Sequence, residues 1–136
     1  GSFFVGQTKP KLYESGIISG LEDLYSSSFN LSFFTKELFE KSDSLGVRIS
    51  QPLRLENGGV YFSVPIGRTP SKEIILEDYH FDLNPSGRQI DLELIYRMSG
   101  KYVSFYSRLG VTKDEGHFKR DRLDSFFETI WEIPIH

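Results

Sequence analysis

The chain contains no cysteine, which excludes disulfide bridges and thiolate metal sites. None of its apolar runs approaches the roughly 20 residues that a membrane-spanning helix requires. The formal net charge is -3, and the basic residues are scattered among acidic ones, so we expect no nucleic-acid partner. No signal peptide is visible, and Gly1-Ser2 is typical of a cloning remnant, so we expect the natural chain to begin elsewhere.

Catalytic motifs are also missing. No serine stands in a Gly-x-Ser-x-Gly pattern, and no glycine-rich phosphate loop follows a predicted strand. We therefore expect neither an enzyme nor a bound cofactor. Aromatic residues are plentiful instead, with 12 Phe, 7 Tyr and 1 Trp. Because Phe and Tyr fit the pleated surface of a sheet, this composition favours a β-fold.

The clearest pattern runs from Leu45 to Arg68, where two alternating segments flank Asn57-Gly58. Alternation places every second side chain on one face of a strand. The pattern predicts a hairpin. A two-residue turn would set Pro52 and Pro65 at hydrogen-bonded sites, where proline has no N–H to donate. We therefore expect a four-residue turn over 56–59, closed by Leu55 and Val60.

Further alternating segments occupy 73–83, 90–98, 103–111 and 127–135, with turn signals at 69–71, 84–87 and 99–100. They predict an all-β fold, an antiparallel up-and-down meander of six to seven strands that forms a barrel or half-barrel. Residues 1–28 are expected to be poorly structured or a short helix, and 29–136 to form the β-domain. Residues 17–25 and 29–41 both allow a helix, but we favour a strand for the second segment.

The predicted sheet has one apolar and one polar face. Such a sheet is either half of a soluble core or the wall of a membrane barrel with a wet interior. We expect the apolar face to contact lipid in the second case and a protein in the first. Its members are Val47, Ile49, Leu53, Val60, Phe62, Val64, Ile90, Leu92, Leu94 and Trp131.

Acidic residues and histidine suggest three small clusters. Asp78, His80 and Asp82 alternate on one face of a strand, as in a metal or acid–base cluster, but we favour a polar row facing solvent or a lumen. Asp114, Glu115 and His117 lie in the predicted polar loop 113–122, where a metal site is possible, but we favour a charge-rich turn. Asp91 and Glu93 share a face, as paired carboxylates do in acid–base catalysis. Because Arg88 and Arg97 are near in sequence, we favour an ion network.

Three segments carry a family resemblance: SLGVRISQPLRLENGGVYFSVPIGR at 44–68, DLNPSGRQIDLELIYR at 82–97 and KDEGHF at 113–118. In order and spacing they resemble the C-terminal translocator barrel of autotransporter-type subtilisin-like serine proteases of Gram-negative bacteria. The resemblance implies a non-catalytic outer-membrane β-domain that assists the secretion or surface display of a passenger. Its partners would be the lipid bilayer or the remainder of a larger barrel.

The chain also departs from that family. It has six or seven predicted strands, whereas the family barrel has about twelve, and it ends in Ile135-His136 rather than in an aromatic residue. The protease motifs themselves are missing. The alternative is a soluble, periplasmic or secreted β-sheet module that binds a protein partner or forms a homo-oligomer through its apolar face.

Overall fold

The computed structural model describes residues 1–11 and 16–133, and these residues form strands and one short 3-10 helix, η1. The elements are β1 (Ser2–Thr8), β2 (Ile18–Leu21), β3 (Leu24–Lys36), β4 (Asp43–Asn57), β5 (Gly59–Arg68), β6 (Ile74–Asp82), β7 (Ile90–Ser99), β8 (Ser104–Lys113), η1 (Glu115–His117) and β9 (Leu123–Glu132). The predicted all-β antiparallel fold is confirmed.

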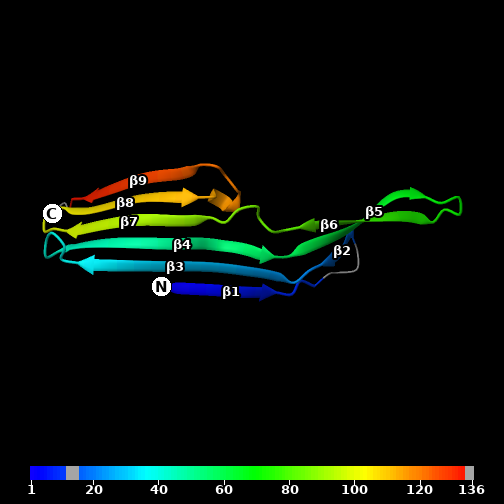
Figure 1. Ribbon diagram of the computed structural model, residues 1–136, viewed down its shortest axis with the longest axis horizontal. Coiled ribbons are helices and arrows are strands. Elements are labelled where there is room, and N and C mark those ends of the chain that lie inside the picture. The colour runs from blue at the N-terminus through cyan, green and yellow to red at the C-terminus, as the bar shows by residue number, and fades with distance from the viewer. Residues whose placement is uncertain (12–15, 134–136) are drawn as a thin grey trace. The chain divides into compact units, whose positions relative to one another are not determined.

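The strands belong to two open sheets (Figure 1). One sheet has the order β1-β3-β4-β7-β8-β9, and the other has the order β2-β5-β6. Consecutive strands β7, β8 and β9 pair antiparallel over their full length, from Ser99 opposite Ser104 to Lys113 opposite Leu123. Among the described residues the sheets do not close into a barrel, and there are nine strands rather than six to seven. Consecutive strands are neighbours in β3-β4, β5-β6 and β7-β8-β9, as in a meander, but β4 has β7 as its other neighbour because β5 and β6 belong to the second sheet.

The expected N-terminal helix is wrong. Residues 17–25 hold β2 and the first residues of β3 instead of a helix. Segment 29–41 holds most of β3, so the strand favoured for it is confirmed. Ile18, Gly20 and Leu21 pair with β5, and this tertiary pairing overrides the weak helical spacing of the segment. Among the first 28 residues, the described ones therefore carry β1, β2 and the start of β3 rather than a helix, and residues 12–15 lie outside the described part of the chain.

The chain divides into two compact units. Unit 1 comprises Gly1–Phe4, Ser28–Leu53 and Ser86–His136, and unit 2 comprises Val5–Ser27 and Arg54–Pro85. The chain passes from one unit to the other within β1, β3 and β4, and again between β6 and β7. Each unit is described by itself below.

The hairpin expected over 45–68 is also wrong. β4 pairs with β7, whereas β5 pairs with β2 and β6, so the two alternating segments lie in different sheets. Asn57-Gly58 does not turn the chain, because Gly58 is nearly extended with a φ of 159°. A Cβ atom on Gly58 would lie 2.5 Å from Cδ2 of Leu24, so glycine permits a close approach of β3 here rather than a turn.

The true partner of β5 is β6, and the turn between them lies where 69–71 predicted one. Thr69 N–H donates to the Glu73 carbonyl at 2.9 Å, and Lys72 N–H donates to the Thr69 carbonyl at 2.9 Å. Pro65 stands beside an irregularity in this ladder, between Pro65 and Gly67. Pro52 lies just beyond the last β4–β7 pair, Ser50 with Asp91. Pro65 thus lies beside a break in the β5–β6 ladder and Pro52 past the end of the β4–β7 ladder, positions that suit a residue with no N–H to donate.

Glycines in unit 1 make room for aromatic rings that lie across the sheet. A Cβ atom on Gly46 would lie 2.2 Å from the ring of Phe34, and one on Gly110 would lie 2.4 Å from the ring of Phe126. Gly110 and Phe126 are also register partners in the β8–β9 ladder. Each ring therefore covers a backbone position that has no side chain of its own.

We predict that Gly110→Val lowers the free energy of unfolding by about 1–3 kcal/mol, because the added side chain overlaps the Phe126 ring. The matched control is Gly67→Val, also in a strand, where an added Cβ atom would come no closer than 3.9 Å to Ile75. Denaturant unfolding of both variants tests this. Equal losses for the two variants would contradict the role assigned to the Phe126 ring.

Candidate functional site

An apolar face covers one side of the sheet in unit 1. Two cross-strand rows form it, because the register sets Val47, Leu94, Leu109 and Phe127 side by side and places Ile49, Leu92 and Val111 in the adjacent row. We call these seven residues the apolar face. Their relative exposures run from 36% at Val111 to 68% at Phe127, so contiguous large apolar side chains face outward.

The predicted apolar residues do not all join this face. Val47, Ile49, Leu92 and Leu94 belong to it, while Leu53 is exposed just beyond the β4–β7 ladder. Ile90 is half-buried at the end of the β7–β8 ladder, opposite Lys113. Trp131 is exposed on β9. The remaining three, on β5, belong to unit 2: Val60, Phe62 and Val64.

Aromatic rings gather toward the other end of β7, β8 and β9. The ring centroids of Phe105 and Trp131 are 4.5 Å apart, and those of Tyr96 and Phe105 are 6.2 Å apart. Phe39 meets Tyr96 edge to face at 6.2 Å. Rings clustered at one end of apolar strands are typical of the aromatic girdle of a membrane barrel, as well as of ordinary cross-strand packing.

The opposite side of the same sheet carries an ionic network. The Glu93 carboxylate lies 3.5 Å from Nη1 of Arg48 and 3.8 Å from Nη1 of Arg108, and Arg108 also pairs with Glu128 at 3.1 Å. Glu93 is only 9% exposed, while its apolar neighbours in sequence, Leu92 and Leu94, are exposed. Around Glu93 the sheet therefore buries a carboxylate and exposes the neighbouring hydrocarbon, which is the reverse of the usual arrangement in a soluble domain. Ile95, two residues further on the same face of β7, is buried as well.

The expected ion network around Asp91 and Glu93 is present with different partners. Glu93 pairs with arginines from β4 and β8, which the sequence did not place beside it. Asp91 accepts hydrogen bonds from Thr112 Oγ1 at 2.8 Å and from Gln89 Nε2 at 3.0 Å. Arg97 lies over the ring of Tyr106, with 5.2 Å from Cζ to the centroid.

The loop after β8 is tied to the segment that precedes β7. Gly116 N–H donates to Gln89 Oε1 at 2.8 Å, and Gly87 N–H donates to the His117 carbonyl at 2.7 Å. A Cβ atom on Gly87 would lie 2.6 Å from Lys119 N, so the two backbones touch. Two of the segments that carry the family resemblance, 82–97 and 113–118, are thus packed against each other.

His117 uses both ring nitrogens in this loop. Its Nδ1 accepts from Gln89 N–H at 3.0 Å, and its Nε2 lies 3.0 Å from the Leu53 carbonyl. Because Nδ1 accepts, the neutral ring carries its proton on Nε2 and donates it to that carbonyl. Both nitrogens are occupied by backbone groups, which supports a structural role for the charge-rich loop rather than metal binding.

Asp114 holds the same loop through its carboxylate. It accepts Arg120 N–H at 2.9 Å and Arg88 N–H at 3.4 Å, and it is buried. The hydrogen bond from the Arg120 amide has the largest effect on the pKa of Asp114, and it lowers that pKa. Burial raises the pKa, but the bond from the Arg88 amide lowers it further, so the pKa lies below its usual 3.8. The carboxylate form therefore fits the loop better than the neutral acid.

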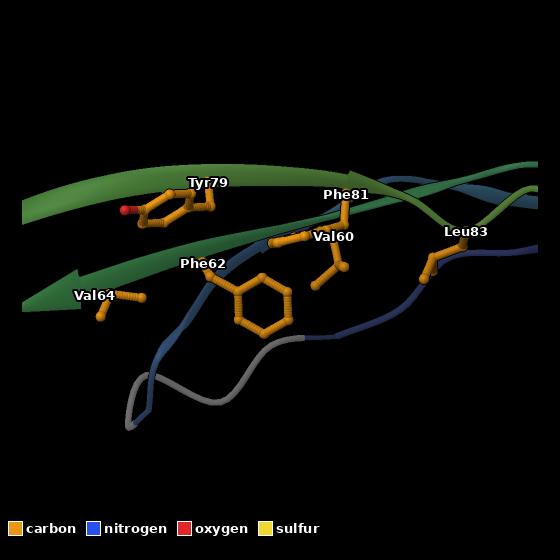
Figure 2. A pocket seen from close by; sticks show the side chains of 6 residues that line it. All are labelled: Val60, Phe62, Val64, Tyr79, Phe81 and Leu83. Atoms are coloured by element: carbon orange, nitrogen blue, oxygen red, sulfur yellow. The ribbon is translucent and has the colours of Figure 1, made fainter.

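Unit 2 has an apolar groove on one face of β5 and β6 (Figure 2). Phe62 and Phe81 meet edge to face with centroids 5.6 Å apart. The figure shows the side chains of neighbouring strands gathered on one side of the ribbon. The groove is lined by Val60, Phe62, Val64, Tyr79, Phe81 and Leu83.

The other face of β5 and β6 is polar and contains the predicted row Asp78, His80 and Asp82. The His80 ring stacks on Tyr61 at 4.5 Å and lies 3.4 Å from Glu22 and 3.8 Å from Asp82. Tyr61 donates its hydroxyl to Glu22 at 2.7 Å, and this bond raises the pKa of Tyr61. Asp78 instead accepts the Ser63 hydroxyl.

No arrangement of three or more His, Asp or Glu residues suited to a metal ion occurs in the described part of the chain. Within residues 1–11 and 16–133 there is also no helix long and apolar enough to cross a membrane.

Sequence reasoning missed Glu22, because its contacts with Tyr61 and His80 depend on the pairing of β2 with β5.

Comparisons with known proteins identified no relative. No family model, no curated protein and no solved structure matches this chain.

We predict that Glu93→Gln destabilises the chain by about 3 kcal/mol, because two arginines lose the buried carboxylate that lies between them. Glu128→Gln serves as the control. It removes a partner of the same Arg108, but its side chain is 45% exposed, so we expect a loss below about 1 kcal/mol. Unfolding midpoints in urea measure both. A larger loss for the Glu128 variant would contradict the assignment.

We also predict that Asp114 stabilises the loop only while it is ionised. Because its folded-state pKa is depressed, this contribution is present above the unfolded value near 3.8 and is lost as the pH falls below it. The stability difference between the native chain and Asp114→Asn should therefore shrink on going from neutral pH to pH values below 3.8. Amide exchange at Arg120 measures the same effect locally. A pH-independent difference would refute it.

Proposed function

We propose that this chain is part of a non-catalytic outer-membrane β-domain that assists the secretion or surface display of a passenger. In this proposal the apolar face of unit 1 contacts lipid, and the ionic network faces a water-filled lumen. The resemblance of segments 44–68, 82–97 and 113–118 to the translocator of autotransporter-type subtilisin-like proteases suggests the passenger role. The cell surface of a Gram-negative bacterium is the corresponding location.

The observation that supports this proposal most is the reversed burial of the two faces. Leu92 and Leu94 are 47% and 44% exposed, whereas Glu93 between them is 9% exposed. Barrel strands in a membrane alternate in this way, with hydrocarbon outward and polar groups inward. The network of Glu93 with Arg48 and Arg108 would then hold adjacent strands together across the lumen wall.

Strand length agrees with this assignment. β7, β8 and β9 have 10 residues each. A transmembrane β-strand needs about 9–11 residues at a tilt near 45°. These strands are longer than the globular average of about 5–6 residues, and the rows of the apolar face cross them and continue onto β4.

The sheet needs further strands to form a barrel. Its order β1-β3-β4-β7-β8-β9 has six members, and bacterial barrels begin at about eight strands. β1 and β9 are its two edge strands among the described residues. We propose that these edges pair with the remainder of a larger barrel.

A matched pair of neighbouring residues tests the lipid contact. Ile49 lies on the apolar face and Ser50 on the opposite side, beside Asp91. We predict that Ile49→Arg weakens insertion into lipid vesicles by about 2–4 kcal/mol, whereas Ser50→Arg has little effect because the arginine would face Asp91. Vesicle flotation of the folded chain measures insertion.

The alternative is a soluble interaction module whose apolar face binds a protein. If the native chain remains monomeric without detergent and does not float with vesicles, the membrane proposal fails. If it requires detergent, floats with vesicles and loses flotation only with Ile49→Arg, the soluble module is excluded. Equal flotation of both arginine variants would show that the apolar face does not contact lipid.

A further inference from the structure

The edge of β6 that faces away from β5 is unpaired among the described residues, and the positions of its outward-pointing N–H and C=O groups follow from the register. In the sheet β2-β5-β6, β6 is an edge strand, and all of its residues are exposed. Ser63 N–H donates to the Ile17 carbonyl and Glu22 N–H donates to the Gly59 carbonyl, so these β5 residues turn their backbone toward β2. Leu83 N–H donates to the Gly58 carbonyl on the other side.

The register then gives the orientation of β6. Val60 and Phe62 of β5 turn their backbone groups toward β6 and are opposite Phe81 and Tyr79. Because backbone direction alternates along a strand, the N–H and C=O groups that point away from β5 belong to Asp78, His80 and Asp82. No strand pairs with this edge among the described residues. An incoming extended chain would therefore bond to these three residues.

Side chains beside this edge differ in character on the two faces. Tyr79 and Phe81 line the apolar groove (Figure 2). Asp78 and Asp82 alternate with them along β6 and so lie on the opposite face, where Glu22 contacts His80. β6 contains three carboxylates, those of Glu77, Asp78 and Asp82, and no lysine or arginine. Since like charges across a strand pair are destabilising, two copies of β6 repel each other.

We propose that β6 is a docking edge for an extended peptide segment that alternates apolar and basic residues and adds antiparallel to the sheet. Cross-strand neighbours share a face, so the basic side chains lie beside Asp78 and Asp82 while the apolar ones extend the groove past Tyr79 and Phe81. Main-chain bonds supply affinity, and the alternation supplies specificity. The proposal concerns unit 2 alone and does not depend on lipid contact by unit 1.

A synthetic peptide that alternates lysine and valine, as long as β6, tests the proposal against the full chain. We expect it to bind at least about tenfold more tightly than a glutamate–valine peptide, because two charge pairs change sign. The double variant Asp78→Asn/Asp82→Asn should reduce that preference. Fluorescence anisotropy of labelled peptides measures binding, and circular dichroism checks that the variant is folded.

Methylated peptides test the hydrogen-bonding direction without altering the protein. In antiparallel addition, residues opposite Asp78 and Asp82 point their N–H groups at β6, and these are the lysines. N-methylation of the lysine amides should abolish binding, whereas N-methylation of the valine amides should be tolerated. The proposal is overturned if methylated valine amides abolish binding and methylated lysine amides do not. It is also overturned if the lysine and glutamate peptides bind equally, if neither binds, or if the chain self-associates and the peptide reverses that association.

Discussion

One uninterrupted register runs from β4 through β7 and β8 to β9, and the character of both faces of that sheet depends on it. Val47, Leu94, Leu109 and Phe127 form one cross-strand row only because each ladder is in step with the next. The same register places Arg48 opposite Glu93. Because side chains alternate with a period of two, a slip by one residue would exchange the hydrocarbon and the charges. The buried network around Glu93 therefore opposes slippage as well as linking strands.

The sequence predicted the strands better than it predicted their partners. Alternation around Val47, Val60 and Leu94 was strong enough to identify β4, β5 and β7, and the turn signal at 69–71 was correct. The expected hairpin over 45–68 failed because Asn57-Gly58 is a strong local turn signal. Local propensity does not include the close approach of Leu24 to Gly58, which comes from a distant strand. The one sequence signal against the hairpin was that a two-residue turn would place Pro52 and Pro65 at hydrogen-bonded sites, where proline cannot donate.

For the candidate sites as well, the sequence predicted which residues share a face but not which residues they contact across strands. The two-faced character of the sheet could be read from the sequence, since it depends only on the alternation of side chains. The partners of Glu93 could not, because Arg48 and Arg108 reach it from strands on either side. Similarly, Asp78, His80 and Asp82 were identified as a row, whereas the stacking of His80 on Tyr61 and its contact with Glu22 require the pairing of β2, β5 and β6.

The exposed apolar face imposes a requirement on any environment of unit 1. Fully burying one large apolar side chain contributes about 1.5–3 kcal/mol, so leaving the seven side chains of the apolar face about half exposed forgoes on the order of 10 kcal/mol. That is comparable to the whole stability of a typical domain, about 5–15 kcal/mol. Whatever covers this face therefore contributes as much to the stability of the sheet as the net stability of an ordinary domain. In the proposed membrane setting, lipid would cover this face without any directional contact, because Leu94 and Phe127 offer only apolar surface there.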